Sequence, residues 1–226
     1  MNDPLPSEQS QVCSLDELRL LATRLLIGWP RTLTWDDFRV VYRLPKGYAH
    51  DTRAWLSAGF RYYFSPARCE GGRYGPGNLR VEVFVDREKT GVLWWRRGRR
   101  LLRHEQGHLD VAGICAREFC VQLSRTRAAT PSQLIADARS LLRDAETRLR
   151  ALNHRYDSFF RGTAHGLNWF VQRRWNRLLR EARDSWKPLP EVKPLAALLP
   201  GRSRSRFWRF LNTPILDLLW PRQGDA

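Results

Sequence analysis

The segment LLRHEQGHLDVAG, residues 101–113, determines which fold and which chemistry we expect of this chain. Its apolar residues recur at helical spacing and predict a helix from about residue 98 to residue 123. His104 and His108 are four residues apart, so both imidazoles lie on one face of that helix and can reach one metal ion. Glu105 lies about 100° round the helix from His104, close enough to contact a water on that ion without being a ligand. The segment therefore predicts a metal-binding helix.

This combination of side chains suits zinc. A hydrolytic zinc site needs neutral nitrogen ligands, an open position for water and a carboxylate that takes the proton. Zinc lowers the pKa of a bound water to about 7, so hydroxide is available at neutral pH. We expect Zn²⁺ on His104 and His108, with Glu105 as the catalytic base of a zinc-dependent hydrolase that cleaves peptide bonds. The alternative is a helix that carries two packing histidines by coincidence.

The helix alone does not supply a third ligand. The extension that metzincins carry after their second histidine is missing. Asp110 projects from nearly the opposite face, and we expect it to anchor the helix to a strand instead. Glu118 lies some 15 Å along the axis, too far to close one coordination sphere. The remaining candidates are His154 and His165, both in later elements.

Several motifs together resemble a bacterial family of predicted zinc peptidases known as domain of unknown function 922. The resemblance extends over roughly residues 33–175 and rests on HEQGHLD preceded by LTWDDF, and then on Tyr156-Asp157, Thr163-Ala164-His165-Gly166, Gln172 and Trp175. It implies a zincin-like fold in which His165 is the third zinc ligand. His154 remains the alternative ligand, although we expect it to face solvent.

Two further residues near the predicted zinc ligands each have two candidate roles. The Tyr156 hydroxyl is a candidate donor to the oxyanion of a tetrahedral intermediate, and a core tyrosine is the alternative. Asp157 is a candidate acceptor behind a ligating imidazole, and an exposed or capping role is the alternative.

The elements around the motif predict an α+β fold. In the zincin-like version, a small, mainly antiparallel sheet packs on the HExxH helix beside further long helices. We divide the chain into an N-terminal helical segment (1–30), a metallopeptidase domain (31–186) and a Pro/Arg-rich extension (187–226). The expected elements are a helix at 14–27, extended runs from 33 and at 56–64, a loop at 70–77, a strand at 79–86, and helices at 132–156 and from about 166 to 186.

The charge balance offers a second function class. The chain has 39 basic and 23 acidic residues, a formal charge of +16, and lysine only at Lys46, Lys89, Lys187 and Lys193. A non-catalytic basic protein that binds nucleic acid or an anionic surface is the alternative function. No nucleic-acid motif supports it, so we expect a peptide or protein substrate and no specific nucleic acid. The run WWRRGRRLLRH, residues 94–104, either attracts an acidic substrate or forms a solvated helical face.

The ends of the chain and the cysteines give weaker expectations. The start MNDPLPSEQS has no signal peptide, and no segment is long and apolar enough to span a membrane, so we expect a cytoplasmic protein, although the family resemblance favours an extracytoplasmic one. The aromatic end at 206–220 packs on the protein's own core or docks a partner or a membrane surface. Four cysteines without C-x-x-C spacing predict buried free thiols.

Overall fold

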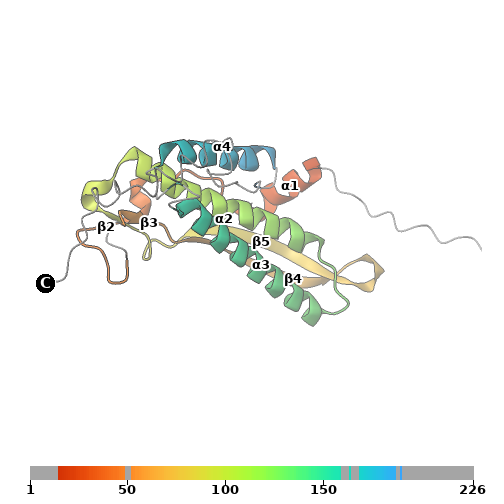
Figure 1. Cartoon of the computed structure of the whole chain (residues 1–226). Helices are drawn as coiled ribbons and strands as arrows, with labels where there is room; N and C mark the ends of the chain where they lie inside the picture. Colours follow the sequence, from red (N-terminus) through yellow and green to blue (C-terminus); the bar gives the residue numbers. More distant parts are fainter. Residues whose placement is uncertain (1–14, 49–51, 159–162, 164–167, 187–188, 190–226) are drawn as a thin grey trace, which may run out of the picture.

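One long helix, α2 (Arg99–Arg125), lies at the centre of the structure (Figure 1). The computed structural model describes residues 15–48, 52–158, 163, 168–186 and 189. Helix α2 packs against the long strands on one side and against helices α3 (Pro131–Asp157) and α4 (Trp169–Ser185) elsewhere. The helix predicted from about residue 98 to residue 123 is therefore confirmed, and it is the element that every other layer contacts.

The middle of α2 is covered on all sides. Every residue from 109 to 120 except Glu118 is buried. Burial on all sides favours apolar residues, and apart from Asp110, Arg117 and half-buried Glu118 this stretch is apolar. Gly113 permits a close approach, because a Cβ there would lie 2.2 Å from the Trp29 ring. The core consists of this helix, the inward side chains of the long strands, and the aromatic residues Trp29, Phe119, Tyr156 and Trp175.

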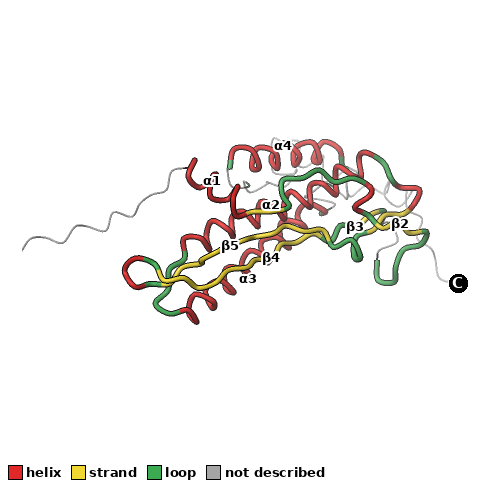
Figure 2. The backbone as a smooth tube through the Cα atoms, turned by 180° about the vertical axis from the view of Figure 1, so that it is seen from behind, coloured by secondary structure: helices red, strands yellow, loops and turns green. Residues whose placement is uncertain are grey.

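The larger sheet is a long hairpin with one short added strand. Strands β4 (Ala58–Arg68) and β5 (Tyr74–Val85) pair antiparallel and run along α2 and α3 (Figure 2). Strand β1 (Leu26–Ile27) joins the other edge of β5 in parallel. The predicted loop at 70–77 is wrong in extent: only a short 3-10 turn at Glu70–Gly72 separates the strands, because Gly75 and Gly77 pair with β4.

A second small sheet lies near the start of α2. Its order is β2 (Arg39–Val41), β6 (Gly91–Leu93) and β3 (Ala54–Trp55), with β2 parallel and β3 antiparallel to β6. The α+β class is confirmed, but there are two small mixed sheets where we expected one that is mainly antiparallel. Parallel neighbours are joined by long connections, not by tight turns, so no local sequence signal reveals them.

The remaining helices follow the predicted pattern. Helix α1 (Leu15–Leu25) lies in the predicted N-terminal segment. The side chain of Thr130 accepts from the Gln133 amide and caps α3, and Asn168 caps α4 in the same way. Short 3-10 turns at Trp35–Asp37 and Trp94–Arg96 connect the strands to neighbouring elements. No helix among the described residues has the length and apolarity needed to cross a membrane.

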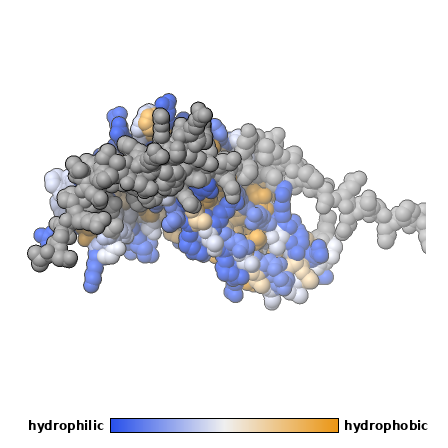
Figure 3. Space-filling view, viewed as in Figure 1, coloured by the Kyte–Doolittle hydropathy of each residue, from blue (hydrophilic) through white to orange (hydrophobic). Residues whose placement is uncertain are grey.

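The described surface is mainly polar. On the face seen in Figure 3, hydrophilic side chains dominate, with small apolar patches between them. Cys115 and Cys120 are buried free thiols, as predicted, and Cys69 is half-buried. Cys13 and the aromatic end at 206–220 lie outside the described residues.

Candidate metal centre

His104 and His108 meet one carboxylate between α2 and the end of α3. Their Nε2 atoms lie 3.2 and 3.0 Å from Oδ1 of Asp157, the last residue of α3. Each of the three residues offers a ligand atom, and these atoms all lie within 4.8 Å of one another. His104, His108 and Asp157 could therefore hold a metal ion. The helical spacing predicted the two histidines, whereas the packing of α3 on α2 supplies the carboxylate.

The other ring nitrogen of each histidine also has a partner. His104 Nδ1 lies 3.1 Å from Gln172 Oε1 and 3.2 Å from Thr163 Oγ1. His108 Nδ1 lies 2.9 Å from Asn153 Oδ1. These partners come from three different parts of the chain, so both imidazoles are held in orientation from behind by oxygen atoms.

The surrounding hydrogen bonds determine which nitrogen carries the proton. The amide of Gln172 donates from Nε2 to Asn176 Oδ1 at 2.7 Å and to the Tyr156 hydroxyl, which turns its Oε1 toward His104. An amide oxygen can only accept a hydrogen bond, so Nδ1 of His104 must carry the proton and donate to Gln172 Oε1. The lone pair of a neutral imidazole is then on Nε2, which faces Asp157. Metal-ligating histidines are held in this way, with the rear N–H given to an oxygen acceptor.

Without a metal, these groups form a charged pair. Burial lowers the pKa of His108, but hydrogen bonding to Asp157 and the negative charges of Asp157 and Glu105 outweigh it and raise the pKa to about 9. Burial raises the pKa of the Asp157 carboxyl, and its contacts with His104 and His108 outweigh that effect and hold the pKa well below its usual range. The site therefore favours a cation next to Asp157.

Tyr156 packs directly on both histidines. Its ring stacks on His104 with centroids 4.8 Å apart and meets His108 edge-on at 4.9 Å. The hydroxyl donates to the backbone oxygen of His104 at 3.1 Å and accepts from Gln172. Gly107 makes room for it, because a Cβ there would lie 2.1 Å from the hydroxyl oxygen. The hydroxyl is thus engaged inside the core, which is the second of the two roles expected for it.

Glu105 lies on α2 between the two histidines. Its side chain is buried, with 3% of its surface exposed. Its charge contributes to the raised pKa values of His108 and Tyr156, so the carboxylate is within electrostatic reach of the cluster.

Gln106 and Asp110 fix the helix to the segment that follows β1. Asp110 accepts from Trp29 Nε1 and from Gln106 Nε2, both at 3.2 Å. Gln106 accepts from the Leu33 amide at 2.7 Å and donates to the Arg31 carbonyl at 3.1 Å. Asp110 anchors the helix as expected, but to the loop after β1 and not to a strand, and Gln106 shares this role.

The structure separates the candidates for a third ligand. His154 is exposed on α3, as expected, and does not belong to the metal-binding group. Glu118 pairs with Arg148 at 2.6 Å. His165 lies outside the described residues, so its role stays a prediction. Asp157 was a candidate hydrogen-bond acceptor for the rear nitrogen of a ligating imidazole. Its carboxylate instead faces the Nε2 atoms of both histidines.

Sequence reasoning missed Asn153. Asn153 and Asp157 are four residues apart on α3, and this spacing places an amide and a carboxylate on one helical face. This spacing was visible in the sequence, but no local pattern indicated that this face of α3 contacts the histidines. Thr163 and Gln172 belonged to the family resemblance without an assigned role.

No family model, curated protein or solved structure matches this chain.

Proposed function

We propose that the chain is a zinc-dependent hydrolase whose substrate is a peptide or protein. The observation that carries the proposal is the convergence of two imidazole Nε2 atoms and one carboxylate, with a buried glutamate on the same helix. The second nitrogens of both imidazoles are engaged by oxygen acceptors, as in metal sites.

The residues fit zinc in type, and the distances from Asp157 Oδ1 to the two imidazoles fit it as well. Zinc bonds to nitrogen and oxygen of about 2.0 to 2.1 Å at tetrahedral angles place neighbouring ligand atoms about 3.3 Å apart. The two Nε2 atoms lie 3.2 and 3.0 Å from Asp157 Oδ1, close to that spacing. Two histidines and one carboxylate are also a ligand set of hydrolytic zinc enzymes, which keep a fourth position for water.

Each residue then has a defined role. His104, His108 and Asp157 hold the ion, and Asn153, Thr163 and Gln172 orient the imidazoles. A zinc ion in this position would supply Lewis-acid activation of water and of the scissile carbonyl. Glu105 takes the proton from the attacking water and later delivers it to the leaving amine. Its burial strengthens these electrostatic effects, because few water molecules screen the charges.

The zincin-like fold is part of this proposal. Supporting it, the β4–β5 hairpin packs on the helix that carries His104 and His108. An extended substrate can add to the edge of a sheet through backbone hydrogen bonds, which is a common mode of peptide recognition.

The test compares the two candidate third ligands. We expect one zinc per chain in the wild type by elemental analysis, and a large loss in Asp157→Ala and in His108→Ala. His165→Ala tests the ligand that the family resemblance implies. If both Asp157 and His165 prove essential for zinc, four protein ligands close the coordination sphere, and the site is structural and not catalytic.

Activity is measured on the same samples with a mixed peptide library. Zinc-dependent cleavage that a chelator abolishes and added zinc restores would support the hydrolase. A folded wild type that binds no zinc when supplied with it would refute the metal site, and with it the proposed function.

A further inference from the structure

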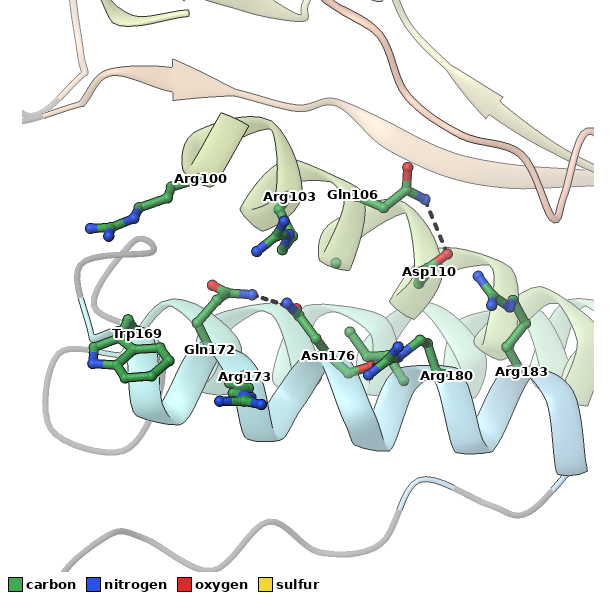
Figure 4. A pocket seen from close by; sticks show the side chains of 12 residues that line it. Arg100, Arg103, Gln106, Asp110, Trp169, Gln172, Arg173, Asn176, Arg180 and Arg183 are labelled. Atoms are coloured by element: carbon green, nitrogen blue, oxygen red, sulfur yellow. Dashed lines mark hydrogen bonds between the residues drawn. The ribbon is translucent and has the colours of Figure 1, made fainter. Parts of the chain in front are cut away.

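A hollow lies between α2 and α4, on a different face of α2 from His104 and His108. It has a volume of about 560 Å³ and is lined by residues of both helices. Figure 4 shows Arg103 directed from α2 toward α4, Arg100 extending sideways from the first turn of α2, and Trp169 at the first turn of α4. We call this hollow the arginine cleft; its arginines are Arg100, Arg103, Arg173, Arg180 and Arg183.

Little negative charge balances these five arginines. Asp110 is the one acidic residue among the lining residues described, and it already accepts from Trp29 and Gln106. Arg183 pairs with Asp184 at 2.8 Å. Arg180 donates to the backbone oxygen of Asn176, not to a carboxylate. Arg100, Arg103 and Arg173 form no ion pair with another described residue.

The spacing of these arginines works against the stability of the isolated helices. Arg100 and Arg103 are three apart on α2, and Arg180 and Arg183 are three apart on α4. Residues at this spacing are neighbours on a helix surface, and like charges there repel. Packing α4 against α2 brings the two sets together around one hollow. A polyanion in the cleft would remove this repulsion.

We propose that the arginine cleft binds a small ligand that carries several phosphate groups. Guanidinium groups bind phosphate oxygens through paired hydrogen bonds, and a phosphate chain gathers several charges within a few ångströms. Asn176 accepts from Gln172, which leaves its NH₂ group as a further donor. The proposal does not rest on the proposed hydrolase, because none of the cleft's arginines belongs to the metal centre, although Gln172 lines the cleft and also contacts His104.

The dimensions suit a ligand of nucleotide size. The cleft volume lies within the range of about 300 to 1,000 Å³ that small-molecule sites occupy. Trp169 and Arg180 are separated by about 16 Å along α4, the length of 11 residues in a helix. Trp169 is 48% exposed, and Arg173 lies 5.8 Å from its ring centroid. A flat aromatic surface beside several arginines can hold a base at one end and a phosphate chain along the rest.

Calorimetric titration of the full-length protein at physiological salt tests the proposal, with tripolyphosphate and ATP as separate probes. We expect saturable binding of both. The double variant Arg103→Ala, Arg180→Ala should bind each probe roughly tenfold more weakly or worse, since two charge-assisted contacts are lost. The matched control, Arg139→Ala with Arg143→Ala, removes two exposed arginines from α3 and should bind like the wild type.

Two further measurements locate the binding and identify the source of the phosphate. Zinc content, measured on the same samples, should be unchanged in the double variant Arg103→Ala, Arg180→Ala. Its weaker binding of phosphate is then not the result of a lost metal ion that coordinates the phosphate. Tighter binding of ATP that Trp169→Ala reduces to the level of tripolyphosphate would identify a nucleotide, and equal binding of both probes would identify the phosphate chain alone. Absence of saturable binding, or equal losses in the cleft and control variants, would overturn the proposal.

Discussion

The Oε1 atom of Gln172 lies 3.1 Å from Nδ1 of His104, a residue 68 positions earlier in the chain. This contact connects the start of α4 to the candidate metal centre on α2. Gln172 also lines the arginine cleft, so one side chain lies between the two sites. The positions of His104 and His108 therefore depend on residues outside the group that could hold a metal ion.

The first prediction concerns these supporting amides. Asn153→Ala removes the one described partner of His108 Nδ1, whereas Gln172→Ala leaves Thr163 beside His104. Loss of such partners costs about 10- to 100-fold in metal affinity, so we expect about 100-fold for Asn153→Ala and about tenfold for Gln172→Ala. Competition with a zinc-binding dye measures both. Gln122→Ala, which removes an exposed amide near the end of α2, is the control, and an equal loss there would contradict the assignment.

The second prediction separates binding from turnover. Glu105→Gln keeps the size of the side chain but removes the base, so zinc content should stay at the wild-type level. Peptide cleavage should fall by about 10²- to 10⁴-fold, the usual contribution of general base catalysis. Glu118→Gln changes another glutamate of α2, one that pairs with Arg148, and should retain activity. Wild-type turnover in Glu105→Gln would remove this residue from the mechanism.

The third prediction concerns the packing of α2. A Cβ at Gly113 would lie within 2.4 Å of three atoms of the Trp29 ring, which Asp110 also holds by a hydrogen bond. Gly113→Ala should therefore lower the free energy of unfolding by roughly 1 to 3 kcal/mol despite the better helix propensity of alanine. Thermal unfolding measures the loss. At Gly59 the added Cβ would make an ordinary contact with Phe84, and Gly59→Ala should leave the melting temperature nearly unchanged.

The fourth prediction concerns the thiols. Burial raises the pKa of Cys115 to about 12 and that of Cys120 to about 11. The thiolate is the reactive form, so both should resist alkylation at pH 8 in the native protein. Half-buried Cys69 should react faster. Peptide mapping after brief treatment with iodoacetamide compares the sites, and denaturant should make all of them reactive. Rapid native labelling of Cys115 or Cys120 would contradict the buried core around α2.

Local sequence patterns were sufficient to predict part of the site. Residues four apart on a helix share a face whatever surrounds them, so His104 and His108 were paired before any packing was known. The same local rules predicted the strand at 79–86, most of which lies within β5, and the three long helices that are now described.

The residues that contact those histidines are set by the packing of the helices and could not be predicted from the sequence. Asp157, Asn153 and Gln172 reach them because α3 and α4 pack on α2, and a contact between separate helices leaves no periodic signal in either one. The two parallel strand pairings and the arginine cleft could not be predicted from the sequence for the same reason. Backbone periodicity is fixed by neighbouring residues, whereas the relative placement of the elements depends on how the whole core packs.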